Sequence, residues 1–251
     1  MNVVLLTALG VGGATVFGAA LGFVFKKPSQ KVNDIILGFA AGVMLAAAVM
    51  GLIVPSIENG GKHAVLVTAA GVLVGAFCLN IADKVVPHLH RVVGVDIENH
   101  SQDISRINKI MLFVLAIAIH NIPEGIAAGV SFGTGDNAQA FTVAGGIALQ
   151  NIPEGMVIIA PMIAAGISKK RTFLIAASTG LIEVLGTLIG YFAVSLSTAI
   201  LPFALAFAGG TMLYVISDEM IPETHGNGNE RYATYALLIG FCLMLILDFY
   251  L

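Results

Sequence analysis

The sequence is short of charged residues. Only 11% of its 251 residues are Asp, Glu, Lys or Arg, whereas a soluble domain averages about 25%. Apolar residues make up 57% of the chain, and its mean hydropathy is +0.94. So few charges cannot cover a globular surface in water, and this apolar content also excludes a disordered chain. The composition therefore indicates a polytopic membrane protein with almost all of its mass in the lipid bilayer.

Other scarcities narrow the function further. The only cysteines are Cys78 and Cys242, which is too few for a disulfide scaffold, and we expect both to be small core residues within helices. The net charge of −3 offers no basic surface, so no nucleic acid partner is expected. No Walker-type loop is present, so ATP drive within this chain is not expected, and no organic cofactor is predicted.

Long apolar runs are what the chain has in abundance. A spanning helix needs about 20 mostly apolar residues, and eight segments meet this requirement. The expected fold is all-α, a single transmembrane domain over residues 1–251 with a cytoplasmic histidine-containing loop at 87–108. The predicted helices cover 3–25, 33–57, 64–86, 109–131, 139–166, 172–196, 200–221 and 232–250.

The basic residues predict the orientation of these helices. Eleven of the twelve lie between helices one and two, three and four, five and six, or seven and eight, and only Lys62 falls on the other side. Because cytoplasmic loops carry the excess of Lys and Arg, both termini are predicted to lie outside the cell. The eleven are Lys26, Lys27, Lys31, Lys84, Arg91, Arg106, Lys109, Lys169, Lys170, Arg171 and Arg231.

Two internal repeats are visible. The segment His-Asn-Ile-Pro-Glu-Gly at 120–125 returns as Gln-Asn-Ile-Pro-Glu-Gly at 150–155. A second repeat, offset by 168 residues, matches 39–45 with 207–213 and relates the first three helices to the last three. Each of the first three helices is matched with the helix five places later, and helices five places apart cross the membrane in opposite directions. The repeat therefore predicts an inverted arrangement of three helices, a central pair and three further helices. Such repeats around a midplane site are typical of transporters.

Three acidic residues interrupt the apolar spans near the bilayer centre: Glu124, Glu154 and Glu183. A charge at this depth costs about 2.5–3.5 kcal/mol or more, so it normally has a partner. No Lys or Arg lies at the same depth, and the only basic side chain there is His120. A cation from outside the chain is therefore the expected counter-charge. The alternative is a hydrogen-bonded polar cluster that only holds helices together.

Helical spacing brings these polar side chains together. His120 and Glu124 are four residues apart and share one face of a helix, with Asn121 beside it. Gln150, Asn151 and Glu154 repeat this pattern on the next helix. One imidazole, two or three carboxylates and several amide oxygens suit Zn²⁺, Fe²⁺ or Mn²⁺. Two facing carboxylates could bridge two metal ions, although one ion is enough to satisfy them.

The paired motifs at 120–125 and 150–155 resemble those of the ZIP family of divalent-metal transporters, bacterial type. The resemblance covers the whole chain and implies uptake toward the cytoplasm across the cell inner membrane. It implies a metal site made by His120, Asn121, Glu124, Gln150, Asn151 and Glu154. It also implies that Glu183 completes a second metal site and that Met44 lies beside the first; a gap-filling role for Met44 is equally compatible with the sequence.

The chain departs from the family pattern at two positions. Many relatives carry His where this chain has Gln150, and some bacterial relatives carry Asp where it has Asn151. The first change removes an imidazole and should soften the preference for zinc. The second removes a charge and weakens the case for a strongly held second metal.

Further polar residues could act at the cytoplasmic end. His88 and His90 could receive metal or sense its level, or could belong to a solvated loop. A second group could line the exit or form a polar helix end: Asp218, Glu219, Glu223 and His225.

The leading hypothesis is a secondary transporter that moves Zn²⁺, and also Fe²⁺, Mn²⁺ or Cd²⁺, into the cytoplasm. A metal-ion channel with the same site is an alternative. An intramembrane metalloenzyme is the rival from another class, but a zinc protease would show His-Glu-x-x-His, which this chain lacks. Metal ions and the lipid bilayer are the expected partners, and a homodimer stays open.

Overall fold

The computed structural model describes residues 2–24, 29–85, 102–164 and 166–250, without the side chains of 83–85, 102–113, 115, 116, 161 and 164. His88 and His90 therefore lie outside the described residues. The regular structure in the described part is entirely helical. Its α-helices are α1 (Asn2–Val24), α2 (Gln30–Ala46), α3 (Val54–Asn59), α4 (Ala64–Val85), α6 (Gln102–Ser131), α7 (Asn137–Ala164), α8 (Lys169–Leu196), α9 (Leu201–Val215), α10 (Ile221–His225) and α11 (Glu230–Tyr250).

The predicted spans are present as helices. Seven helical stretches within the described ranges are long and apolar enough to cross a membrane, and α6, with 30 residues, is an eighth long helix that carries the polar motif. The predicted loop at 87–108 was too long, because α6 begins at Gln102. Residues 102–108 are mostly polar, so hydropathy could locate only the apolar part of this helix. The seventh helix likewise continues through α10 to His225.

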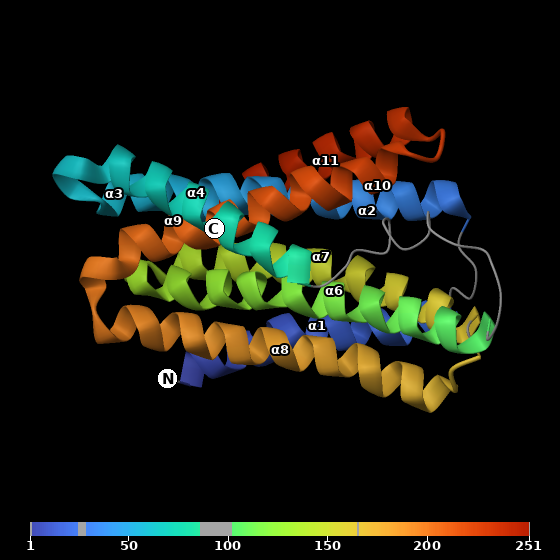
Figure 1. Cartoon of the computed structure of the whole chain (residues 1–251). Helices are drawn as coiled ribbons and strands as arrows, with labels where there is room; N and C mark the ends of the chain where they lie inside the picture. Colours follow the sequence, from blue (N-terminus) through green and yellow to red (C-terminus); the bar gives the residue numbers. More distant parts are fainter. Residues whose placement is uncertain (1, 25–28, 86–101, 165, 251) are drawn as a thin grey trace.

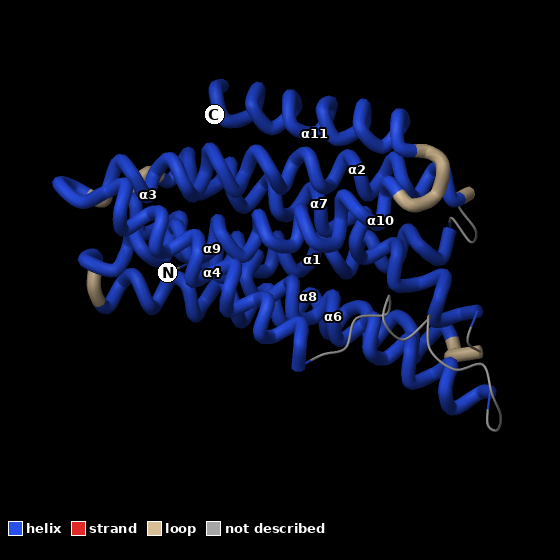
Figure 2. Tube along the Cα trace, turned by 45° about the horizontal axis from the view of Figure 1, so that its top comes forward, coloured by secondary structure: helices blue, strands red, loops and turns tan. Residues whose placement is uncertain are grey.

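The long helices run roughly side by side and form two groups (Figure 1). Helices α1, α6, α7 and α8 pack against one another, and α2, α4, α9 and α11 form the other group. The groups meet mainly where α2 contacts α7 and where α6 contacts α9. Figure 2 shows the same helices from a second direction. The polar motifs of α6 and α7 lie on helices that take part in these contacts between groups.

Two π-helical segments interrupt the second group. Segment η1 (Ala47–Ile53) links α2 to α3, and η5 (Ile216–Met220) links α9 to α10. Each is followed by a proline at the start of the next helix, Pro55 or Pro222, which has no N–H to donate to the preceding turn. Such wide turns are frequent at functional sites. The hydropathy pattern of the sequence does not predict these π-helical turns.

Glycines allow backbone-to-backbone crossings within the first group. A Cβ on Gly125 of α6 would collide with the carbonyl oxygen of Glu183, and one on Gly155 of α7 would collide with that of Thr15. Gly125 and Gly155 are equivalent in the 30-residue repeat, and Thr15 and Glu183 are separated by the 168-residue offset. These matched contacts support the inverted-repeat hypothesis.

The alternating helix directions gather the described basic residues. Lys31, Lys169 and Arg231 stand near the first residues of α2, α8 and α11, which begin at one end of the molecule, whereas Lys62 lies at the other end (Figure 1). We call these the basic end and the opposite end. At the basic end the buried carboxylate of Asp34 accepts hydrogen bonds from three amide side chains, those of Gln30, Asn227 and Asn229.

The expectation for the cysteines was wrong. Cys78 on α4 and Cys242 on α11 are both free and exposed rather than part of the core. These two helices lie at the rim of the second group and bury a small share of their surface. A sequence repeat identifies equivalent positions in two helices. It does not show whether the helix face that carries those positions points to the protein interior or to lipid.

Candidate metal site

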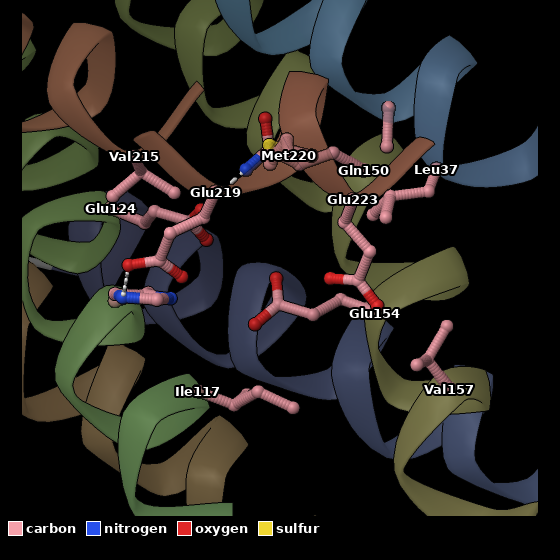
Figure 3. A pocket seen from close by; sticks show the side chains of 12 residues that line it. Leu37, Ile117, Glu124, Gln150, Glu154, Val157, Val215, Glu219, Met220 and Glu223 are labelled. Atoms are coloured by element: carbon pink, nitrogen blue, oxygen red, sulfur yellow. Dashed lines mark hydrogen bonds and ion pairs between the residues drawn. The ribbon is translucent and has the colours of Figure 1, made fainter. Parts of the chain in front are cut away.

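A cavity of about 100 Å³ lies between the two helix groups. His120 and Glu124 reach its wall from α6, Gln150 and Glu154 from α7, and Glu219 from η5 (Figure 3). The spacing of the motifs explains this arrangement, because residues four apart on a helix share one face. His120, Glu124 and Gln150 are buried. The structure thus brings together the two motifs that the sequence predicted would face each other.

Two side-chain contacts cross the cavity. Gln150 Nε2 donates to Glu124 Oε1 at 2.6 Å, which joins the motif of α7 to that of α6. His120 Nε2 lies 2.9 Å from Glu219 Oε1, drawn as a dashed line in Figure 3. The second contact joins the two helix groups. The imidazole that is predicted to bind metal is therefore engaged by a carboxylate of the opposite group.

The two motif asparagines are anchored to main-chain carbonyls. Asn151 Nδ2 donates to the carbonyl of Val11 at 3.2 Å, and Asn121 Nδ2 donates to that of Thr179 at 3.4 Å. Both asparagines are fully buried. Because each amide nitrogen is held by a neighbouring helix, each amide oxygen remains available as an acceptor. The two anchors are related by the same offsets as the repeats.

Four buried oxygen atoms of the two motifs have no hydrogen-bond partner within the described residues. They are Asn121 Oδ1, Glu124 Oε2, Gln150 Oε1 and Asn151 Oδ1. An unsatisfied buried acceptor costs about 1–3 kcal/mol. A bound cation would relieve this cost at several atoms at once. These are oxygen ligands, and the imidazole of His120 adds a nitrogen, a mixture suited to a divalent transition metal.

Four of the predicted ligands are not among the residues that line the cavity: Asn121, Asn151, Glu183 and Met44. Glu183 of α8 is buried behind it and accepts from Thr15 Oγ1 at 3.0 and 3.1 Å. Met44 packs in the apolar core. Among the described side chains, no group of three His, Cys, Asp or Glu residues already converges as a metal-binding set. The site in this conformation thus depends on amide oxygens as well as carboxylates.

The residues predicted for the exit divide into two sets. Glu219 and Glu223 line the cavity. Asp218 is exposed, and it is not among the lining residues. His225 binds within the helix end instead: Nδ1 lies 2.9 Å from the carbonyl of Ile221, and Nε2 lies 3.0 Å from Thr234 Oγ1 on α11. These contacts give His225 a structural position between α10 and α11.

Sequence reasoning missed two side chains near the site. Met220 lines the cavity, although Met44 was the methionine singled out. Thr15 contacts Glu183, and it occupies the position equivalent to Glu183 in the 168-residue repeat. The 168-residue offset was the only sequence signal that relates Thr15 to Glu183. It is weak at this position because Thr and Glu are not similar residues.

Comparisons with known proteins identify the family of this chain. Residues 95–248 match the family described as ZIP Zinc transporter. The chain is 42% identical to the zinc transporter GufA of Myxococcus xanthus, over 99% of this chain and 98% of the relative. It is 39% identical to the zinc transporter ZIPB of Bordetella bronchiseptica, over 94% and 77%. It is 32% identical to human zinc transporter ZIP11, over 94% and 93%.

Helices that cross the membrane and a buried polar site between them define a membrane transporter. The chain belongs to the ZIP zinc transporter family. It is accordingly a multi-pass protein of the cell membrane, and the family is one of metal-ion transporters rather than enzymes.

Proposed function

We propose that this protein carries divalent transition-metal ions, Zn²⁺ foremost, into the cytoplasm through the site between α6 and α7. The observation that carries the proposal is a set of four buried motif oxygen atoms without hydrogen-bond partners within the described residues. Two of these atoms belong to Glu124 and Gln150, which line the cavity together with Glu154. The relatives described above are named zinc transporters. Fe²⁺, Mn²⁺ and Cd²⁺ offer the same coordination chemistry and are further candidate cargoes.

The cavity supports a direction for release. Ile117 precedes His120 on α6, which begins at the basic end, and Val157 follows Glu154 on α7, which ends there. The lining residues Leu37 and Glu223 also lie toward that end. Because basic residues mark the cytoplasmic side, we infer a conformation whose cavity faces the cytoplasm.

Apolar side chains occupy the same helices on the other side of the site. Five of these side chains are at most 1% exposed: Ala127 and Val130 on α6, Val143 on α7, and Ala48 and Leu205 in the second group. An ion that enters from outside cannot pass this closed layer without a rearrangement. This asymmetry favours a carrier with alternating access over an open channel.

The test is metal uptake by liposomes that contain the purified protein and an entrapped metal-sensitive dye. Wild type should show saturable Zn²⁺ entry, and Glu124→Gln and Glu154→Gln should lose most of it. Glu58→Gln is the matched control, because Glu58 is an exposed carboxylate near the opposite end. If wild type admits no divalent metal, or if the two cavity variants match it, the proposal fails. Uptake that does not saturate would indicate a channel.

Orientation is tested separately by single cysteines placed at Lys62 and Lys169 after Cys78 and Cys242 have been replaced by alanine. Impermeant thiol reagents added to intact cells should label Lys62→Cys and leave Lys169→Cys unlabelled. The reverse pattern would invert the proposed orientation.

A further inference from the structure

Thr15 makes a side-chain contact unlike those of three other buried threonines, Thr179, Thr187 and Thr211. Its hydroxyl lies within hydrogen-bond distance of both carboxylate oxygens of Glu183, 168 residues away. Thr179, Thr187 and Thr211 instead donate to carbonyls three or four residues back in their own helices. Such local bonds are common for threonine within helices. The hydroxyl of Thr15 is directed across a helix interface to an acidic side chain.

The surroundings of this contact fix the geometry of both residues. Thr15 and Glu183 are each 0% exposed. The main-chain carbonyl of Thr15 lies against Gly155, and that of Glu183 lies against Gly125. Both backbones are therefore seated on the two motif helices. The side-chain bond between them completes a connection among α1, α6, α7 and α8.

The charge of Glu183 makes the bond more than a packing contact. Within the described residues no Lys or Arg forms an ion pair with this carboxylate, and its nearby ionisable neighbours include Glu124 and Glu154. A hydroxyl carries one proton and bonds one carboxylate oxygen at a time, so lone pairs on Glu183 stay available. A donor of this kind orients a carboxylate without neutralising it.

We propose that Thr15 is a positioning residue that holds Glu183 in place to bind the transported metal. This inference rests on the proposed function. Groups that hydrogen-bond to metal ligands fix their orientation, and removing them typically lowers metal affinity about 10–100-fold. Thr15→Val keeps the shape of the side chain and removes the hydroxyl, so it should weaken metal binding by a factor in that range. Thr15→Ser keeps the hydroxyl donor and should restore most of the affinity that Thr15→Val loses.

The measurement is a Zn²⁺ titration of the purified full-length chain, stripped of metal with a chelator, in competition with a chromogenic dye. Thr211→Val is the matched control. It removes a buried hydroxyl that bonds only within α9, and its Zn²⁺ affinity should equal that of wild type. Thermal unfolding followed by circular dichroism monitors folding, since the chain has no tryptophan. A general folding defect would lower affinity in Thr15→Val and Thr15→Ser alike.

The double variant with Glu183→Gln separates positioning from structure. If Thr15 acts through Glu183, Thr15→Val should cause no further loss of affinity in the Glu183→Gln background. An equal further loss, an unchanged affinity in Thr15→Val, or a failure of Thr15→Ser to restore binding would each overturn the inference. The proposed function is tested separately by the liposome assay. It fails only if wild type transports no metal or if Glu124→Gln and Glu154→Gln transport metal as wild type does, whatever the affinity of Thr15→Val.

Discussion

Gly155 on α7 offers the sharpest test of how the site is built, because a matched glycine lies on the same helix. A Cβ at Gly155 would collide with the carbonyl oxygen of Thr15 on α1, whereas a Cβ at Gly145 would meet no atom within 4 Å. Both positions are helical. Alanine therefore adds the same methyl group to both, and only Gly155→Ala forces two helices apart.

The expected magnitude follows from two opposing terms. Alanine is favoured over glycine in a helix by about 0.5–1 kcal/mol. Overpacking a tight interface costs about 1–3 kcal/mol. Gly145→Ala should thus be neutral or slightly stabilising, and Gly155→Ala should lose up to about 2 kcal/mol. For a chain of this length that corresponds to a fall in Tm of roughly 4–8 °C.

The assay combines circular dichroism melts with the Zn²⁺ titration. Because α1 and α7 must separate by about an ångström to reach van der Waals distance, Asn151 should lose its anchor on Val11 and Zn²⁺ affinity should fall as well. Equal Tm values and equal affinities for Gly145→Ala and Gly155→Ala would refute the reasoning, since the close crossing of α1 and α7 would then have no energetic consequence.

Three further predictions concern single contacts. Glu219→Gln removes the carboxylate that engages His120, so Zn²⁺ should bind a few-fold more tightly in the dye titration; weaker binding would instead make Glu219 a ligand. Asn151→Asp loses the donor to the carbonyl of Val11, so its Tm should fall below that of wild type in chelator and recover with excess Zn²⁺; a fall that Zn²⁺ does not reverse would contradict this. Asp34 does not line the cavity, and Asp34→Ala removes the acceptor of three hydrogen bonds. Its Tm should fall by several degrees while its Zn²⁺ affinity stays unchanged. A loss of affinity together with the loss of Tm would link the hydrogen bonds of Asp34 to the metal site.

The sequence was sufficient to predict the helices and the two facing motifs because both depend on local periodicity. Runs of about 20 apolar residues define spans, and the i, i+4 spacing places His120 and Glu124 on one face. Helix ends were less accurate, since α6 begins in a polar stretch that hydropathy does not recognise as helical. The π-helical turns at η1 and η5 depend on tertiary packing as well as on the prolines that follow them.

The details of the site were beyond sequence reasoning because they depend on contacts between distant helices. The bond from Thr15 to Glu183 and the pairing of His120 with Glu219 join elements about 100 or more residues apart. Met44 was assigned to the site by resemblance, and the structure places it in the apolar core instead of the cavity wall. The exposed cysteines show the same limit, because a position in a helix does not define the face that points to lipid.

The anchors of the two asparagines have a consequence for how the cargo preference of this protein can change. Each amide is held by a main-chain oxygen, that of Val11 or that of Thr179, and every residue type has such an oxygen. Substitution at positions 11 and 179 therefore leaves the anchor atom itself in place. Selection or engineering for another metal has to act through the side chains that face the cavity, such as Gln150 and His120, while this part of the framework stays the same.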